Sequence, residues 1–119
     1  MTGGGARGRK MRVITEHRVV HTDPMALQAG DVVQVGRRDD EWSGWLWCTN
    51  AAGKSGWVPE SYLDRQGESG VVRCDYTTRE LSVVAGQVLT AGVSEAGWVW
   101  VTNEAGDSGW VPEKHLEPS

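Results

Sequence analysis

The sequence of 119 residues contains no phenylalanine, only four prolines and only two cysteines. No stretch approaches the roughly 18 consecutive apolar residues that a membrane-spanning helix needs, so we expect no membrane partner. Cys48 and Cys74 fall at unequal positions of the two halves of the chain, which argues against a disulfide framework and favours reduced thiols in the cytoplasm. Residues 1–11 carry basic side chains without a following apolar run, so we expect a disordered basic tail and no secretory signal.

The rest of the chain is acidic. Residues 12–64 carry five basic and eight acidic side chains, and residues 70–118 carry three basic and seven acidic ones. Nucleic-acid affinity depends on neutralising phosphates with lysine and arginine, so such a surface disfavours binding to a phosphate backbone. We therefore expect no nucleic-acid partner.

An internal repeat organises the sequence. Trp45–Leu63 aligns with Trp98–Leu116 at an offset of 53 without gaps, and 13 of the 19 positions are identical. Upstream the match continues at an offset of 56 for Ala29-Gly30 and of 59 for Val13. Repeat one therefore has about three extra residues in each of two places. Because insertions are tolerated in loops rather than within paired strands, these two places are predicted to be loops.

The repeat predicts the domain boundaries. The extra residues of repeat one lie in His17–Pro24 and in Val35–Trp45. The stretch between the repeats is polar and contains glycine, which is typical of a linker. We expect one domain at 12–64, a linker at 65–69 and a second domain at 70–119.

The local patterns indicate strands. Trp45–Thr49 and Trp98–Thr102 are rich in residues that favour strands, and each is followed by a glycine-containing connection and a second apolar run. Further short strands enter through glycine turns at Gly30 and Gly86. Five short strands in about 50 residues, without a helical pattern, predict an all-β fold of two small five-stranded barrels.

The ordered motifs resemble the Src-homology-3 (SH3) family. That family reads "ALYDY … ELSF..G … GWW … G.VPSNY". Repeat two follows it through Val72-Arg73-Cys74-Asp75-Tyr76, Glu80-Leu81-Ser82, Ala85-Gly86, Gly97-Trp98 and Gly109-Trp110-Val111-Pro112. Repeat one follows it through Ala29-Gly30-Asp31, Gly44-Trp45 and Gly56-Trp57-Val58-Pro59-Glu60-Ser61-Tyr62. The arrangement resembles small bacterial proteins built from tandem variant SH3 domains.

The resemblance implies an aromatic peptide groove in each repeat. The groove residues that it implies are Trp45, Trp57, Pro59 and Tyr62 in repeat one, and Tyr76, Trp98, Trp110, Pro112 and His115 in repeat two. Thr15 and His17 stand where repeat one would carry the ALYDY tyrosines, and Cys74 stands at such a position in repeat two. Neither set is complete by the family standard.

Acidic side chains flank these positions, and they support two interpretations. They select an arginine or lysine next to the bound segment, or they merely keep an acidic domain soluble. The candidate residues are Asp23, Asp39, Asp40 and Glu41 in repeat one, and Glu80 and Glu95 in repeat two.

The alternation of side chains along a strand predicts which tryptophans face outward. If Leu46 and Cys48 point to the core, Trp45 and Trp47 face outward together, and Trp98 and Trp100 repeat this pattern. We expect Trp45 and Trp98 to contact ligand, and Trp47 and Trp100 to take part in packing.

The sequence therefore predicts a protein-interaction module that binds extended, proline-containing and basic segments, as a monomer or weak homodimer. No nucleophile–base set, metal-ligand spacing or phosphate-binding loop is present, so we expect no enzyme activity, metal or cofactor. Three alternatives remain open. One is a cell-wall peptide-binding module, one is self-association through tryptophan-rich faces, and one is a methyl-lysine reader with an aromatic cage.

Overall fold

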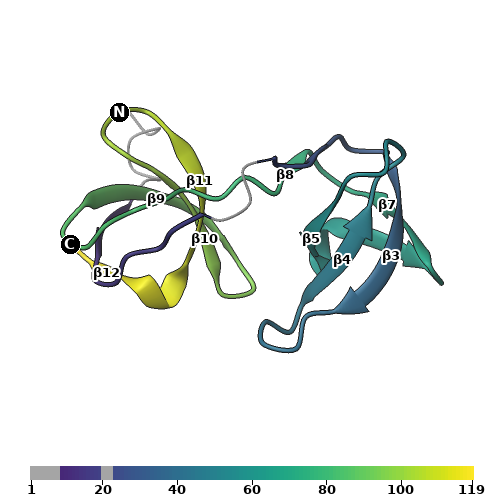
Figure 1. The fold of residues 1–119 in the computed structure, drawn as a ribbon, viewed down its shortest axis with the longest axis horizontal. Helices are drawn as coiled ribbons and strands as arrows, with labels where there is room; N and C mark the ends of the chain where they lie inside the picture. Colours follow the sequence, from purple (N-terminus) through teal and green to yellow (C-terminus); the bar gives the residue numbers. More distant parts are fainter. Residues whose placement is uncertain (1–8, 20–22) are drawn as a thin grey trace. The chain divides into compact units, whose positions relative to one another are not determined.

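The computed structural model describes residues 9–19 and 23–119, and these residues form strands, turns and two short 3-10 helices. The all-β prediction is confirmed. The chain divides into two compact units (Figure 1). Unit 1 combines Met1–Thr22 with Glu80–Ser119, and unit 2 is the continuous segment Asp23–Arg79.

Unit 2 contains a five-stranded sheet and a two-stranded ribbon. The sheet has the order β5-β4-β3-β7-β6, and the ribbon pairs β2 with β8. All neighbouring strands are antiparallel. The elements are β2 (Ala26–Leu27), β3 (Val32–Arg38), β4 (Trp45–Thr49), β5 (Ser55–Pro59), the 3-10 helix η2 (Glu60–Tyr62), β6 (Leu63–Gln66), β7 (Ser69–Val72) and β8 (Tyr76–Thr77).

Unit 1 contains the equivalent five-stranded sheet, with the order β11-β10-β9-β1-β12. Its strands are also antiparallel. The elements are β1 (Arg9–Val13), β9 (Val88–Glu95), β10 (Trp98–Thr102), β11 (Ser108–Pro112), the 3-10 helix η3 (Glu113–His115) and β12 (Leu116–Pro118).

The two repeats exchange their first strands. β1 belongs to repeat one but lies between β9 and β12 of repeat two, whereas β7 belongs to repeat two but lies between β3 and β6 of repeat one. In Figure 1 the purple start of the described chain accordingly lies with the green and yellow strands of unit 1. The register is the same in both units, because Val13 pairs with Leu116 just as Val72 pairs with Leu63.

The exchange includes the arm that follows each first strand. In unit 1, His17 of repeat one forms a bridge with Val83 of repeat two. In unit 2, Tyr76 of repeat two pairs with Leu27 of repeat one. The two pairs are equivalent, because Tyr76 matches His17 at an offset of 59 and Val83 matches Leu27 at an offset of 56. We call residues 9–19 and 69–78 the exchanged segments.

The domain boundaries expected from the repeat are therefore corrected. The segment 12–64 contributes to both units, and so does 70–119. The expected linker 65–69 instead joins β6 to β7 as a hairpin whose turn holds Gly67 at φ 65°. Its polar composition misled the prediction, because only one face of this edge hairpin is buried. Of the expected tail 1–11, residues 9–11 lie in β1, and residues 1–8 lie outside the described residues.

A short connection accompanies the exchange. If repeat two folded by itself, Thr77 would pair with Ser82. In unit 2 Thr77 pairs with Ala26, which is the residue of repeat one equivalent to Ser82. Only residues 78–81 would then remain for the turn. In the structure the chain instead continues from Thr78 in unit 2 to Glu80 in unit 1. Exchange of identical elements costs little when the same contacts are re-formed, and a short connecting loop favours it.

Each core contains side chains from both repeats. The core of unit 1 includes Met11 and Val13 from β1 beside Leu89, Val99 and Val111 from repeat two. In unit 2, Val72 of β7 is likewise buried. Burial of a valine or methionine side chain contributes about 1.5–3 kcal/mol, so the exchanged strands are integral to both cores.

Candidate functional site

Four side chains from both repeats meet in unit 1, and we call them the histidine cluster: His17, Glu80, Trp98 and His115. The His17 ring lies edge-on to the Trp98 ring, with centroids 5.6 Å apart, and edge-on to the His115 ring at 5.7 Å. Its Nε2 lies 2.7 Å from Oε1 of Glu80. The exchanged arm of repeat one thus supplies the residue that all three partners from repeat two contact.

Backbone hydrogen bonds hold His17 in this position. His17 and Val83 each donate their N–H to the other's carbonyl at 2.9 Å. Upstream, the N–H of Ile14 donates to the carbonyl of His115 at 2.8 Å. The arm that carries Glu80 lies so close to β11 that a Cβ on Gly109 would be 2.7 Å from the Glu80 carbonyl carbon. Only glycine fits at this point of approach.

The histidine cluster is accessible from solvent. Trp98 and His115 are half-buried, and the side-chain exposure is 15% for His17 and 33% for Glu80. The Nδ1 atom of His115 is buried and has no hydrogen-bond partner within the described part of the chain. The cluster therefore presents flat rings and one carboxylate.

Two tyrosines occupy the equivalent place in unit 2, and we call them the tyrosine pair: Tyr62 and Tyr76. Their rings lie edge-on, with centroids 5.5 Å apart. The hydroxyl of Tyr76 donates to the backbone carbonyl of Trp57 at 2.9 Å. Tyr62 is half-exposed, but Tyr76 is only 7% exposed.

The exchange therefore sorts the rings by type. His17 is equivalent to Tyr76 at an offset of 59, and His115 is equivalent to Tyr62 at an offset of 53. Sequence order alone would place each histidine with a tyrosine of its own repeat. In the structure both histidines lie in unit 1 and both tyrosines in unit 2. The sequence analysis noted His17 only as a replaced tyrosine, and its equivalence to Tyr76 was the signal for a site position.

The outward-facing prediction is wrong for Trp45, which is 5% exposed and lies opposite the buried Pro59. The connection before it, residues 39–44, is long, and the Asp39 N–H donates to the Trp45 carbonyl at 3.0 Å. In unit 1, Trp98 is likewise opposite the buried Pro112, but only Ala96-Gly97 precede it, and it remains half-exposed.

The other tryptophans pair across their hairpins. Trp47 packs edge-on against Trp57 at 5.0 Å, and Trp100 packs against Trp110 at 5.4 Å. The guanidinium of Arg37 lies 5.1 Å from the centre of the Trp57 ring. Trp110 is only 4% exposed. These contacts agree with the packing expected for Trp47 and Trp100, and they place Trp57 and Trp110 in the same pairs.

Four of the six candidate carboxylates belong to unit 2. Asp23 forms an ion pair with Lys54 at 2.9 Å. The Oδ1 atom of Asp39 accepts the backbone N–H groups of Glu41 and Trp42, which shapes the turn. Asp40 is exposed, as is the side chain of Glu41.

The other two carboxylates lie near the histidine cluster. Glu80 is one of its members, and Glu95 is the strand partner of Trp98. Unit 1 therefore brings its candidate carboxylates to the accessible aromatic rings.

The family comparison agrees with this geometry. Residues 10–66 match the family model described as the variant SH3 domain. Over these residues, just under half of the chain, the sequence is similar to that family. SH3 domains are in general protein-interaction modules and are typically non-catalytic. Because of the exchange, the matched SH3 segment supplies β1 to unit 1 and β2–β6 to unit 2.

Three ionisable groups within the matched segment have displaced pKa values: Arg38, Glu60 and Cys48. A bidentate pair joins Arg38 to Glu60, with N–O distances of 3.0 and 3.1 Å. The hydrogen bond from Arg38 lowers the pKa of the Glu60 carboxyl. Burial raises the pKa of the Cys48 thiol to about 11. Cys48 is therefore a protonated core side chain, as expected, whereas Cys74 is exposed.

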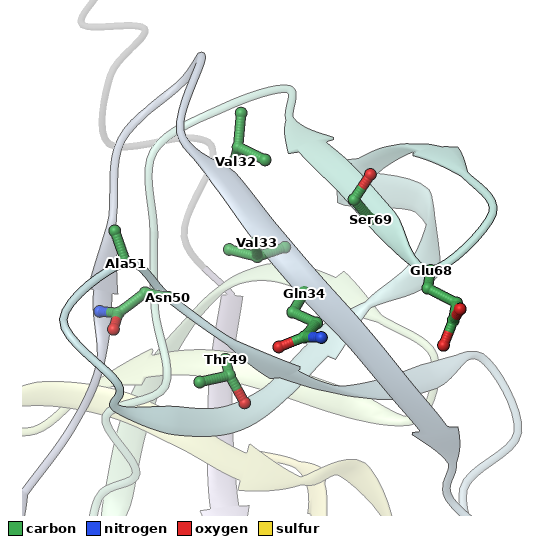
Figure 2. Close-up of a pocket in the computed structure, with 8 residues that line it drawn as sticks. All are labelled: Val32, Val33, Gln34, Thr49, Asn50, Ala51, Glu68 and Ser69. Carbon is green, nitrogen blue, oxygen red and sulfur yellow. The ribbon is translucent and has the colours of Figure 1, made fainter.

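A shallow pocket of about 480 Å³ lies elsewhere on unit 2 (Figure 2). It lies beside β3, at the end of β4 and the start of β7. Its lining is Val32, Val33, Gln34, Thr49, Asn50, Ala51, Glu68 and Ser69. In unit 1, Lys10 is equivalent to Ser69, and its Nζ reaches Thr90 Oγ1 at 3.2 Å. The pocket includes none of the predicted SH3 groove residues.

Two features are absent from the described ranges, 9–19 and 23–119. These ranges contain no group of three or more histidine, cysteine, aspartate or glutamate side chains arranged to hold a metal ion. They also contain no helix long and apolar enough to cross a membrane.

Proposed function

We propose that the chain is a non-catalytic interaction module that binds extended, proline-containing and basic peptide segments, and that the histidine cluster of unit 1 is its main binding surface. The observation that carries this proposal is the half-exposed Trp98 ring beside His17 and His115. Flat aromatic faces fit the ridges of a polyproline II helix, which is ordered before it binds and so costs little entropy to dock.

The charge at this surface supports a basic segment. Glu80 is part-exposed and lies against His17, and Glu95 is paired in the sheet with Trp98. An exposed carboxylate contributes only about 0–1 kcal/mol to such a contact. Glu80 and Glu95 would therefore orient the ligand and raise its association rate, while the rings supply most of the affinity.

Unit 2 is expected to bind the same peptides more weakly. Trp45 is buried there, and the hydroxyl of Tyr76 is already bonded to the Trp57 carbonyl. The two units thus offer surfaces of the same origin but of different accessibility.

The test is a nitrogen–proton NMR titration of the seven tryptophan indole signals. The probe is a synthetic peptide of repeated Ala-Pro-Pro that ends in two arginines. We expect saturable shifts of the Trp98 indole, weaker when the arginines are replaced by glutamine. Substituting Trp98→Ala should weaken binding by about tenfold or more, as for an aromatic side chain at the centre of a contact.

Trp100→Ala is the matched control, because Trp100 lies two residues further along β10 but packs on Trp110. We expect its affinity for the peptide to equal that of the parent protein. If no indole moves at millimolar peptide, peptide binding by this surface is rejected. Concentration-dependent indole shifts without peptide would instead favour self-association.

A further inference from the structure

We infer that the His17–Glu80 pair makes binding at the histidine cluster responsive to protons: the surface takes a segment bearing arginine or lysine when His17 is neutral and releases it when His17 is protonated. This inference rests on the proposed function of the same surface. It starts from the 2.7 Å contact between His17 Nε2 and Glu80 Oε1. This contact ties the charge of the ring to the carboxylate that would meet the ligand's cation.

The charge of the pair changes with the protonation of His17. A neutral imidazole donates its N–H to the Glu80 carboxylate, and the pair carries one negative charge. A protonated imidazole still donates to Glu80, but the pair is then neutral. Histidine is the side chain that ordinarily changes charge between about pH 5 and 8.

The surroundings of His17 do not mask this change. The groups packed against it are Glu80, the His115 ring and the Trp98 ring. The neighbouring charges form an exposed Glu16–Arg18 ion pair at 3.2 Å on its own segment. On η3 the exposed charges are Glu113 and Lys114, and Glu95 is the strand partner of Trp98. The opposite charges of Glu16 and Arg18, and those of Glu113 and Lys114, offset each other, which leaves the His17–Glu80 pair, Glu95 and the ionisable His115 to set the local sign.

Unit 2 lacks this response at the equivalent place. Tyr76 replaces His17 there, and its hydroxyl donates to a backbone carbonyl instead of a carboxylate. The residue equivalent to Glu80 at an offset of 56 is Pro24. Tyrosine stays neutral throughout the range in which histidine titrates. The exchanged segments therefore bring His17 and Glu80 together in unit 1 and leave neither a histidine nor a glutamate at the equivalent positions of unit 2.

The experiment compares the free and the peptide-bound protein at pH 8.0 and pH 5.5, using the arginine-ended Ala-Pro-Pro peptide and the Trp98 indole signal. Without peptide, this signal should follow a sigmoidal pH titration, because the Trp98 ring lies 5.6 Å from the His17 ring. With peptide, binding should be roughly two- to fivefold weaker at pH 5.5, in proportion to the loss of one surface ion pair.

Two variants separate the pair from other titrating groups. His17→Tyr copies the residue of unit 2, keeps an aromatic ring and should bind with the same affinity at both pH values. Glu80→Gln keeps the size of the side chain and should remove both the preference for arginine and its pH dependence. Near-ultraviolet circular dichroism at both pH values establishes that every variant is folded.

The outcomes separate the two proposals. Equal affinity at both pH values in the parent protein overturns the proton response and leaves peptide binding intact. A pH dependence that persists in His17→Tyr assigns it to another group and also overturns the inference. Absence of binding at both pH values rejects the proposed function, and the inference fails with it.

Discussion

Units 1 and 2 share strand order and register, yet they differ at the place where their aromatic rings meet. Unit 1 gathers His17, His115 and Trp98 on an accessible surface, whereas unit 2 gathers Tyr62 and Tyr76 with the Tyr76 hydroxyl bonded to backbone. Because the first strands are exchanged, each surface combines rings from both repeats. The comparison shows that duplicated sequence can yield two chemically distinct surfaces when the repeats trade a segment rather than fold separately.

The largest effect is expected from cutting the chain, because fragments test which segments make up each unit. Residues 23–79 hold all strands of unit 2 in one piece, so this fragment should fold alone. Residues 12–64 lack β7 and should be unfolded at low concentration or associate by mutual exchange. Circular dichroism, NMR dispersion and molar mass in solution report the outcome.

The result for the continuous fragment decides the arrangement. An unfolded 23–79 fragment together with a stable monomeric 12–64 fragment would mean that the repeats fold separately. A cysteine pair placed at Arg12 and Glu117 in a Cys74→Ser background gives independent evidence, because these residues are strand partners only in the exchanged form. Antiparallel partners lie within the range of distances that a disulfide spans.

Two equivalent glycines provide the next largest effect. A Cβ on Gly109 would lie 2.7 Å from the backbone nitrogen of Leu81, whereas a Cβ on Gly56 would meet the side-chain methyl of Thr78 at 2.7 Å. Gly109→Ala must displace backbone and should destabilise by about 2–4 kcal/mol, while Gly56→Ala should cost about 1–2 kcal/mol. Chemical denaturation of both variants measures the difference. Equal losses would show that the two arms approach their sheets equally closely.

Removing one hydroxyl tests the closed state of unit 2. Tyr76→Phe leaves the ring in place but deprives the Trp57 carbonyl of its hydrogen bond, which should cost about 0.5–1.5 kcal/mol. Peptide shifts at the Trp98 indole of unit 1 should not change. A neutral effect on unfolding would mean that water replaces the hydroxyl at this carbonyl.

The smallest effect at neutral pH is expected at Cys48. Cys48→Val installs the residue that unit 1 carries at the equivalent Val101, and it should change stability by less than about 1 kcal/mol at pH 7. In the parent protein the thiol pKa is raised to about 11 in the folded state, above its usual value of 9.0. The contribution of the buried thiol to the free energy of unfolding is therefore complete below pH 9 and decreases as the pH rises towards 11.

In the Cys48→Val variant the free energy of unfolding should lack this decrease at alkaline pH. Unfolding curves of the variant and the parent protein from pH 8 to pH 11 measure the difference. Thiol labelling adds a second readout, because the exposed Cys74 should react in the native protein and Cys48 only after unit 2 opens. Fast labelling of Cys48 at pH 8 would show that unit 2 is not closed around it.

Much of the fold follows from local patterns in the sequence. The Trp45–Thr49 and Trp98–Thr102 strands, the glycine turns and the longer connection before Trp45 all lie where the repeat predicts them. The burial of Cys48 also follows from strand alternation. The burial of Trp45 does not, because strand alternation takes no account of what the rest of the fold packs against a side chain.

The tertiary structure sets which first strand completes the sheet of each unit. β1 and β7 are equivalent segments, and Val13 makes the same register contact with Leu116 that Val72 makes with Leu63. Exchanged and separate repeats therefore satisfy nearly the same strand pairs, and no local preference distinguishes them. The sequence by itself determined two copies of an SH3-like strand pattern with their turns and core positions. Only the tertiary structure decided which first strand completes which sheet, and hence that one surface holds two histidines and the other two tyrosines.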